Sequence, residues 1–328
     1  MTDWVQQAQH LTDEVLRPAA TEVDGSGMIP QSHFETLRDQ GFYGLAFTSK
    51  DPVTTLADVG EILVSGCLAT AFVWAQHHGT LLRLLMSRND ALKAQFLADL
   101  RSGAITAGVS GSGYANPDNP LVVATETDDG YTITGRAPFV TGWGYVDVIG
   151  VTAYDTRADK TVTFLIDAID GPNIHSKRIP LSAADASNTV QLTFNGHHIP
   201  HTAVIHVRKT PRGGLSIADR AILRINGSLA LGVARSCLTE ADRIGHPCHI
   251  CGKHTPCSAR LSTTRPLATE TSTTPAPEPA NSPSPPPTTS PPPQEAHPSN
   301  AANPPREWSG KPPSAWSAQP PRKSSHAS

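Results

Sequence analysis

The stretch Asp128–Ala153, DDGYTITGRAPFVTGWGYVDVIGVTA, indicates the fold of the middle of the chain. Its opening Asp-Asp-Gly is a hairpin signal, because it lies between two runs rich in β-branched residues. Strands that follow strands without helical periodicity between them predict an antiparallel β sandwich or barrel. The predicted strands are Leu121–Thr127, Tyr131–Gly135, Val146–Ala153, Val162–Ile166 and Val190–Phe194.

Helical patterns lie on both sides of this β region. Apolar residues recur at steps of three and four from Trp4 to Ala19, which predicts one amphipathic helix. Cys67–Met86 is apolar nearly all round, as is typical of a buried central helix, and Asn89 is placed to cap a helix over Ala91–Leu100. A long helix is predicted from Ser216 to about Ile244.

The order of these blocks predicts a multi-domain α+β protein. We expect an N-terminal helical bundle at 1–103 and a middle β domain at 104–210. The start of a C-terminal helical domain follows at 211–246, and a tail rich in Pro, Ser and Thr at 247–328.

The tail differs sharply in composition from the rest of the 328-residue chain. Of the 30 prolines, 20 lie after residue 246, and no Val, Ile, Phe, Tyr, Met or Asp follows Ile250. Such a segment lacks the apolar side chains of a core, so we expect it to be disordered. Its proline tracts could form a polyproline II ligand, which keeps open a non-enzymatic scaffold function.

Charge and hydropathy exclude several classes of protein. The net charge is -3, and the region before the tail is acidic, which argues against nucleic acid as the main partner. The longest apolar run, Ile62–Ala75, is shorter than the roughly 20 residues of a membrane span. The N-terminus has no signal-peptide pattern. We therefore expect a soluble, cytoplasmic protein.

The order of blocks, together with several local strings, resembles the acyl-CoA dehydrogenase superfamily. The strings are IPQSHFETLRDQGFYGL near the N-terminus, Asp128–Ala153, TVQLTFNGHHIPHTAVI at the end of the β region, and INGSLALGVARSCLTEAD in the last helix. This resemblance implies a flavoenzyme that binds FAD between its β domain and its C-terminal helices. It also implies an acyl-CoA substrate, a flavoprotein as electron acceptor and a homo-oligomer.

The resemblance points to two groups of cofactor-binding residues. Phe139-Val140-Thr141 matches the family's Trp-Ile-Thr, so Phe139 would pack against the isoalloxazine ring and Thr141 would offer its hydroxyl near flavin N5. Val109-Ser110-Gly111-Ser112 stands where the family binds flavin or CoA phosphate, with Ser110 in place of a threonine. From the residues alone, Phe139 could equally be a core residue, and the Ser/Gly stretch a plain loop.

The catalytic base is not evident from the sequence. Some family members carry a glutamate near the start of the long helix, where this chain has Ile222 and Leu223. The nearest carboxylates are Asp219 and Glu240, for which we expect solvated positions. The tail stands where the family has further helices, which predicts a truncation or frame change and impaired FAD binding and activity.

Histidines and cysteines suggest further, weaker possibilities. His78, in the apolar helix, could act as an acid or base if the protein is a flavin-dependent monooxygenase of the same fold. We expect His197, His198 and His201 to be surface residues. The run Cys248-His249-Ile250-Cys251 with His254 and Cys257 has zinc-binding residue types, but no loop separates the ligand pairs, so no metal site is predicted.

Overall fold

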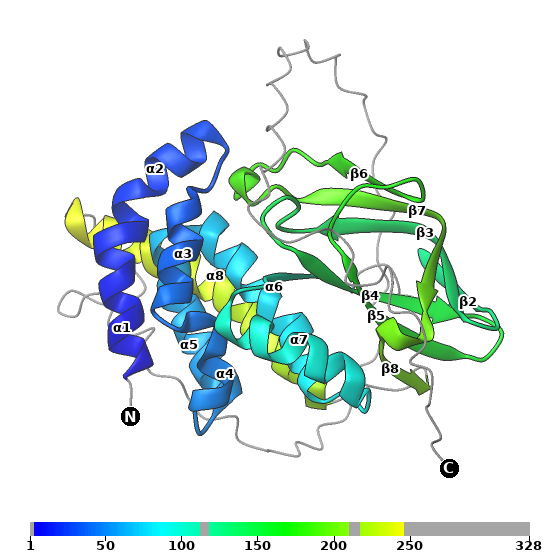
Figure 1. Ribbon diagram of the computed structural model, residues 1–328. Helices are drawn as coiled ribbons and strands as arrows, with labels where there is room; N and C mark the ends of the chain where they lie inside the picture. The colour runs from blue at the N-terminus through cyan, green and yellow to red at the C-terminus, as the bar shows by residue number, and fades with distance from the viewer. Residues whose placement is uncertain (1–2, 112–117, 210–216, 246–328) are drawn as a thin grey trace, which may run out of the picture.

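The computed structural model describes residues 3–111, 118–209 and 217–245. Figure 1 shows the helices gathered on one side of the molecule and the sheet on the other. Most of the buried apolar residues form one cluster that spans both layers, from Leu11 in the first helix to Phe194 in the sheet. The predicted tail 247–328 and its cysteines lie outside the described residues.

The helical layer confirms most of the predicted helices. The first helix is longer than the expected Trp4–Ala19, because a π-helical turn at Thr12–Leu16 joins α1 to α2 without a break. Asn89 caps α7 as predicted, its side chain accepting a hydrogen bond from the Leu92 amide at 3.1 Å. The bounds are α1 Trp4–Leu11, α2 Arg17–Ser26, α3 Gln31–Asp39, α4 Leu45–Thr48, α5 Pro52–Gly66, α6 Leu68–Leu85 and α7 Asp90–Ser102.

The sheet has eight strands in the described region, and the predicted hairpin pairs β2 with β3. The order is β6-β7-β3-β2-β4-β5-β8, with β1 beside β4. Two halves of the sheet are linked by a single pair, Val123 with Tyr154, as at a corner of a sandwich. The strands are β1 Ala107–Ser110, β2 Val122–Glu126, β3 Gly130–Val140, β4 Val148–Asp155, β5 Lys160–Asp167, β6 Ile174–Arg178, β7 Val190–Pro200 and β8 Val204–Lys209.

The middle sheet is mixed, whereas the sequence predicted an antiparallel sandwich or barrel. Val123 of β2 meets Tyr154 of β4 in parallel, and β1 forms a second parallel pair. β1 pairs with β4 in parallel, with Ala107 opposite Val148 and Ser110 opposite Val151. The hairpin of β2 and β3 lies between them in sequence and supplies the long crossover that a parallel pair requires. Strand periodicity shows which residues alternate but not which strands become neighbours, so the sequence could not reveal this pair.

The long C-terminal helix, α8 (Ile217–Arg243), is confirmed and runs across α5 and α6 (Figure 1). Two glycines allow the close approach of α5 and α8. A Cβ atom on Gly60 would lie 2.8 Å from the Ser228 hydroxyl, and one on Gly232 would lie 2.5 Å from the Glu61 carbonyl oxygen. The helices are therefore nearly in backbone contact at these positions.

An ion pair fastens α8 to α5. Arg235 donates to one carboxylate oxygen of Glu61 from Nε at 2.9 Å and from Nη2 at 2.6 Å. Glu61 is 4% exposed, so without Arg235 its carboxylate would be buried with no counter-ion.

Replacing Arg235 by methionine is expected to lower the free energy of unfolding by about 2 kcal/mol, because the Glu61 carboxylate would stay buried without a counter-ion. The expected loss is smaller than for a fully buried pair, since the Arg235 side chain is 21% exposed. Urea unfolding measures it. Arg243→Met is the matched control, because its partner Glu240 is exposed. Equal losses in the two variants would contradict the role of burial.

In the described part of the chain, no helix is long and apolar enough to cross a lipid bilayer.

Candidate functional site

The end of β3 carries a bulge that exposes an aromatic ring. The pairing of β3 with β7 shifts register between Ala137 and Val140, so Pro138 and Phe139 fall in the irregular segment. Phe139 is 57% exposed, whereas Val140 is fully buried. Bulges re-aim side chains and are common beside functional sites. Phe139 is thus not a core residue here, and its ring is free to stack on a ligand.

A chain of three buried hydroxyl groups lies directly after this bulge. The Oγ1 atoms of Thr141 and Thr189 are 3.0 Å apart, and the Oγ atom of Ser187 lies 3.0 Å from Thr189 Oγ1. Thr141 is 5% exposed, Thr189 3% and Ser187 not at all. The structure therefore places the predicted Thr141 at the outer end of a hydrogen-bonded series.

The loop beside Thr141 is held to the segment before β7 by the backbone. The Gly142 amide donates to the Ser187 carbonyl at 2.9 Å, and the Trp143 amide donates to the Asn188 carbonyl at 3.2 Å. Asn188 returns a hydrogen bond from Nδ2 to the Trp143 carbonyl at 2.6 Å. These contacts fix the position of Thr141 relative to Ser187 and Thr189.

The structure brings β1 close to the same place. A Cβ atom added to Gly108 would lie 3.4 Å from the Thr141 carbonyl oxygen, so Gly108 packs against Thr141. Val109 and Ser110 are the next two residues along β1. Ser110 is fully buried, and its hydroxyl has no hydrogen-bond partner among the described residues. An unpaired buried hydroxyl is costly unless something else satisfies it. Ser112 lies outside the described residues.

The two histidines of α6 lie in the core against β1. Nδ1 of His77 accepts a hydrogen bond from the Ala107 amide at 3.1 Å. Burial lowers the pKa of His77 to about 3, with the Leu100 carbonyl opposing the shift. Both rings are therefore neutral at pH 7, since burial and the neighbouring His77 also hold the pKa of His78 well below its usual value.

His78 is fully buried, and neither ring nitrogen has a partner among the described residues. Its ring packs edge-on against Trp74, with centroids 4.6 Å apart, and against His77 at 5.3 Å. The structure therefore places aromatic rings against His78. Its role as an acid or base stays a prediction, because no described residue is placed to exchange a proton with its ring.

No catalytic base is evident among the described residues of α8 named in the sequence analysis. Leu223, at an expected base position, is 52% exposed. The side chain of Asp219 lies outside the described residues. Glu240 is ion-paired with Arg243 at 2.6 Å, and the hydrogen bond from Arg243 lowers the pKa of the Glu240 carboxyl. The expectation of a solvated Glu240 is confirmed.

Two carboxylates on α5 escaped the sequence analysis. Besides Glu61, Asp58 lies 3.6 Å from Arg224 of α8, and burial raises its pKa despite that arginine. Both carboxylates form ion pairs with arginines of α8 and so hold α5 and α8 together. The amphipathic pattern of α5 gave no sign of them, because a charged residue on a buried face is recognised only when its partner helix is known.

The hydroxyl pair Ser187 and Thr189 also escaped the sequence analysis. The sequence offered one signal, the string Ser187-Asn188-Thr189 just before a predicted strand. It would have pointed to the site only if this strand were known to pair with the strand that ends at Val140. That pairing, with Val140 opposite Val190, was visible only in the structure.

Of the three histidines expected at the surface, His198 and His201 are exposed, whereas His197 is partly buried. His198 contacts Asp129 at 3.0 Å, and His201 stacks on Tyr131 with centroids 5.5 Å apart. Among the described residues there is no group of three His, Cys, Asp or Glu side chains that could hold a metal ion. The Cys248–Cys257 cluster lies outside these residues.

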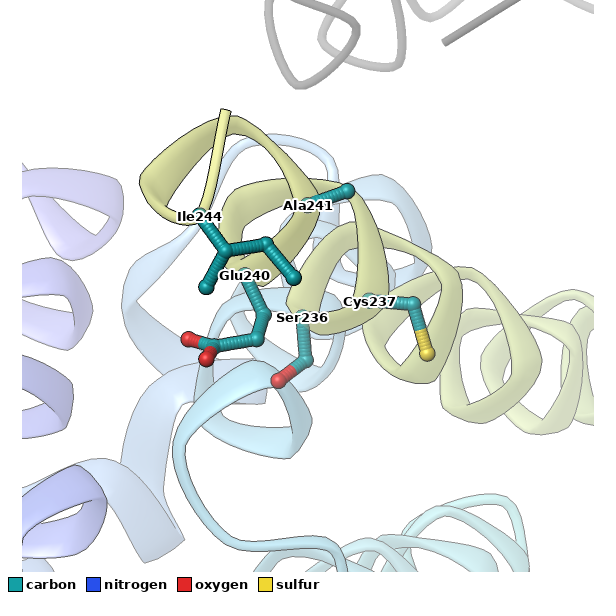
Figure 2. Close-up of a pocket in the computed structure, with 5 residues that line it drawn as sticks. All are labelled: Ser236, Cys237, Glu240, Ala241 and Ile244. Atoms are coloured by element: carbon teal, nitrogen blue, oxygen red, sulfur yellow. The ribbon is translucent and has the colours of Figure 1, made fainter. Parts of the chain in front are cut away.

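A pocket on α8 lies away from the hydroxyl chain. Figure 2 shows its lining, which comes from the last turns of this single helix. In Figure 1 that end of α8 is the one farthest from the sheet. It is a surface depression without a free charged group, because Glu240 is bound by Arg243. The residues are Ser236, Cys237, Glu240, Ala241 and Ile244.

Comparison with known proteins gives a consistent set of relatives. No family model matches the sequence. A curated relative, benzylmalonyl-CoA dehydrogenase from Aromatoleum aromaticum, is 27% identical over 244 residues, which are 71% of this chain and 64% of that protein. The chain therefore spans slightly less than two thirds of the length of this relative.

Solved structures share the fold at low identity. Butyryl-CoA dehydrogenase from Megasphaera elsdenii matches with a TM-score of 0.60 and 20% identity, over 80% of this chain and 74% of that one. PigA, solved with FAD and proline, matches with a TM-score of 0.60 and 19% identity, over 74% of this chain and 67% of that one. At this identity the match establishes the arrangement of helices and sheet.

Proposed function

We propose that this chain belongs to the acyl-CoA dehydrogenase superfamily and is an FAD-dependent oxidoreductase that removes hydrogen from the α and β carbons of an acyl-CoA thioester. Support comes from the relative named benzylmalonyl-CoA dehydrogenase and from PigA, which was solved with FAD. The observation that carries the proposal is the exposed ring of Phe139 two residues before the buried hydroxyl of Thr141.

The residues at this place fit a flavin. An isoalloxazine ring is flat and aromatic and carries several hydrogen-bond acceptors. Phe139 offers an exposed aromatic face, Thr141 ends a chain of hydroxyls, and Ser110 has a buried hydroxyl that nothing described satisfies. In the proposal Phe139 stacks on the ring, Thr141 and Ser110 donate hydrogen bonds, and Val109 completes the wall.

The cofactor would supply the redox chemistry by accepting a hydride. The protein's part is to hold the acyl chain in line with the ring and to exclude water. Because Ile222 and Leu223 stand where the resemblance places a glutamate, we also propose slow turnover. A flavoprotein electron acceptor, a homo-oligomeric state and a cytoplasmic location belong to the same proposal.

Purification of the full chain tests the proposal directly. We expect a flavin absorption spectrum with added FAD, weak but measurable binding of FAD, and slow acyl-CoA oxidation with an artificial electron acceptor. Oxygen consumption with reduced flavin and no response to acyl-CoA would instead indicate a flavin-dependent monooxygenase. A chain that binds no FAD would refute both enzyme functions and leave the scaffold function of the tail.

Replacing Phe139 by alanine is expected to raise the Kd for FAD by about 3- to 10-fold, because an aromatic stack contributes about 0.5 to 1.5 kcal/mol beyond area burial. Quenching of flavin fluorescence measures the Kd. Val207→Ala is the control, since Val207 is another exposed apolar residue of the same sheet, on the edge strand β8. An unchanged Kd in Phe139→Ala would remove this residue from the site.

A further inference from the structure

We infer that Ser187 and Thr189 are positioning residues that aim the proton of the Thr141 hydroxyl outward, toward an acceptor atom of the bound flavin. This inference rests on the proposed function for the identity of the acceptor. The direction of the hydrogen-bonded chain, however, follows from the protein alone.

The three hydroxyls together carry one more proton than the hydrogen bonds between them use. Each of the three hydroxyls has one proton to donate, and two hydrogen bonds link them, at 3.0 Å each. One proton is therefore left over. It belongs to Ser187 at the inner end, to Thr141 at the outer end, or to Thr189 if both neighbours donate to it.

Burial decides between these three arrangements. Ser187 is fully buried, and among the described residues its Oγ atom has Thr189 as its one hydrogen-bond partner. If the spare proton were on Ser187 or on Thr189, a donor of one of the two more deeply buried residues would be left unsatisfied, whereas Thr141 is the most exposed of the three. Ser187 therefore donates to Thr189, and Thr189 donates to Thr141. The proton of Thr141 is the free one.

The loop that carries Ser187 is held in a fixed, strained conformation. Ala184 and Asn188, on either side of the short 3-10 turn Asp185–Ser187, both have positive φ, at 58° and 46°. Non-glycine residues adopt this region at an energetic cost, and such strain clusters at functional sites.

Two contacts offset the strain of this loop. Arg178 pairs with the Asp185 carboxylate at 2.7 Å, and Asn188 donates to the Trp143 carbonyl at 2.6 Å. Ser187 consequently has little freedom to turn away from Thr189.

The result is a donor of fixed direction beside an exposed aromatic ring. A flavin ring presents nitrogen and carbonyl acceptors along one edge. One of these atoms could accept the hydrogen bond that the Thr141 hydroxyl donates. Thr189 touches no cofactor in this arrangement, so it acts through Thr141.

FAD binding by the full chain tests the positioning role. We expect Thr189→Val to raise the Kd for FAD about 3- to 10-fold, the worth of one oriented hydrogen bond. Thr189→Ser, which keeps the hydroxyl, should restore the Kd to within about twofold of wild type. In the Thr141→Val background, Thr189→Val should have no further effect.

Thr12→Val is the matched control. Thr12 is a fully buried threonine in the helical layer that donates to the Ile62 carbonyl at 3.2 Å, so its loss should not alter the Kd. A wild-type Kd in Thr189→Val, or a weakened Kd that Thr189→Ser does not restore, would overturn the inference. A wild-type chain that binds no FAD would refute the proposed function instead.

A second measurement, without FAD, tests the direction of the hydroxyl chain. In Thr141→Val, Ser187 still donates to Thr189, but the Thr189 proton has no acceptor. In Ser187→Ala, Thr189 still donates to Thr141, and the Thr141 proton is directed outward. We therefore expect a lower urea midpoint of unfolding for Thr141→Val than for Ser187→Ala. The reverse order would show that the chain runs the other way and would overturn the inference.

Discussion

Acidification from pH 6 to pH 4 is expected to destabilise the wild-type protein about 1.4 kcal/mol per pH unit more steeply than its His77→Asn variant. His77 is fully buried and has a pKa of about 3, against 6.5 for an ordinary histidine. In this pH window the unfolded chain binds a proton at His77 that the native chain cannot accept. Stability is therefore retained above pH 6.5 and lost as the pH falls toward 3.

The geometry of His77 gives the reason. Its Nδ1 atom accepts the Ala107 amide proton, so protonation of that nitrogen would break the bond between α6 and β1. Asparagine offers an oxygen in place of Nδ1 but cannot titrate. The variant should be less stable at pH 7, because it leaves a cavity, and flatter in its pH dependence.

Urea unfolding at pH 7, 6, 5 and 4 measures the difference, which should reach about 3 kcal/mol over two pH units. His10→Asn is the control, since His10 is an exposed residue of α1. Parallel stability curves for wild type and His77→Asn would show that His77 is protonated in the native protein. His78 should behave in the same direction, because burial also lowers its pKa.

Replacing Gly232 by alanine is expected to lower the free energy of unfolding by about 2 to 4 kcal/mol. The added Cβ atom would lie 2.5 Å from the Glu61 carbonyl oxygen and 2.5 Å from Val64 Cβ. Neither is the free end of a flexible side chain, so α8 would have to move away from α5. The same movement would stretch the Glu61–Arg235 ion pair.

Gly227→Ala separates crowding from helix propensity. Gly227 lies on the same helix, and nothing would come within 4 Å of its Cβ atom. Alanine favours a helix over glycine by up to about 1 kcal/mol, so this control should be neutral or stabilising. Chemical denaturation compares the two. Similar changes in both variants would mean that α8 is not tightly packed against α5.

The succession of helices and strands could be predicted from the sequence because local patterns determine it. The buried helix at Cys67–Met86, the cap at Asn89 and the hairpin at Asp128–Gly130 all follow from periodicity and turn chemistry. The π-helical turn at Thr12–Leu16 and the parallel pair of β1 with β4 did not, since both depend on partners distant in the chain.

The candidate site divides in the same way. Phe139, Thr141 and Ser110 are candidates because the strings that carry them resemble those of the acyl-CoA dehydrogenase superfamily. The exposure of Phe139 was not predictable, because a bulge reverses the side on which an alternating strand presents a residue. Thr189 and Ser187 were not found, since their role depends on cross-strand register.

The sequence by itself determined the composition of the layers, the superfamily resemblance and the residue types available to a flavin, because these depend on local propensity and linear order. Only the tertiary structure decided which hydroxyls share protons, which carboxylate is neutralised by α8 and which histidines stay neutral. Those properties depend on distance and burial, and distance between residues remote in sequence is settled only when the layers pack.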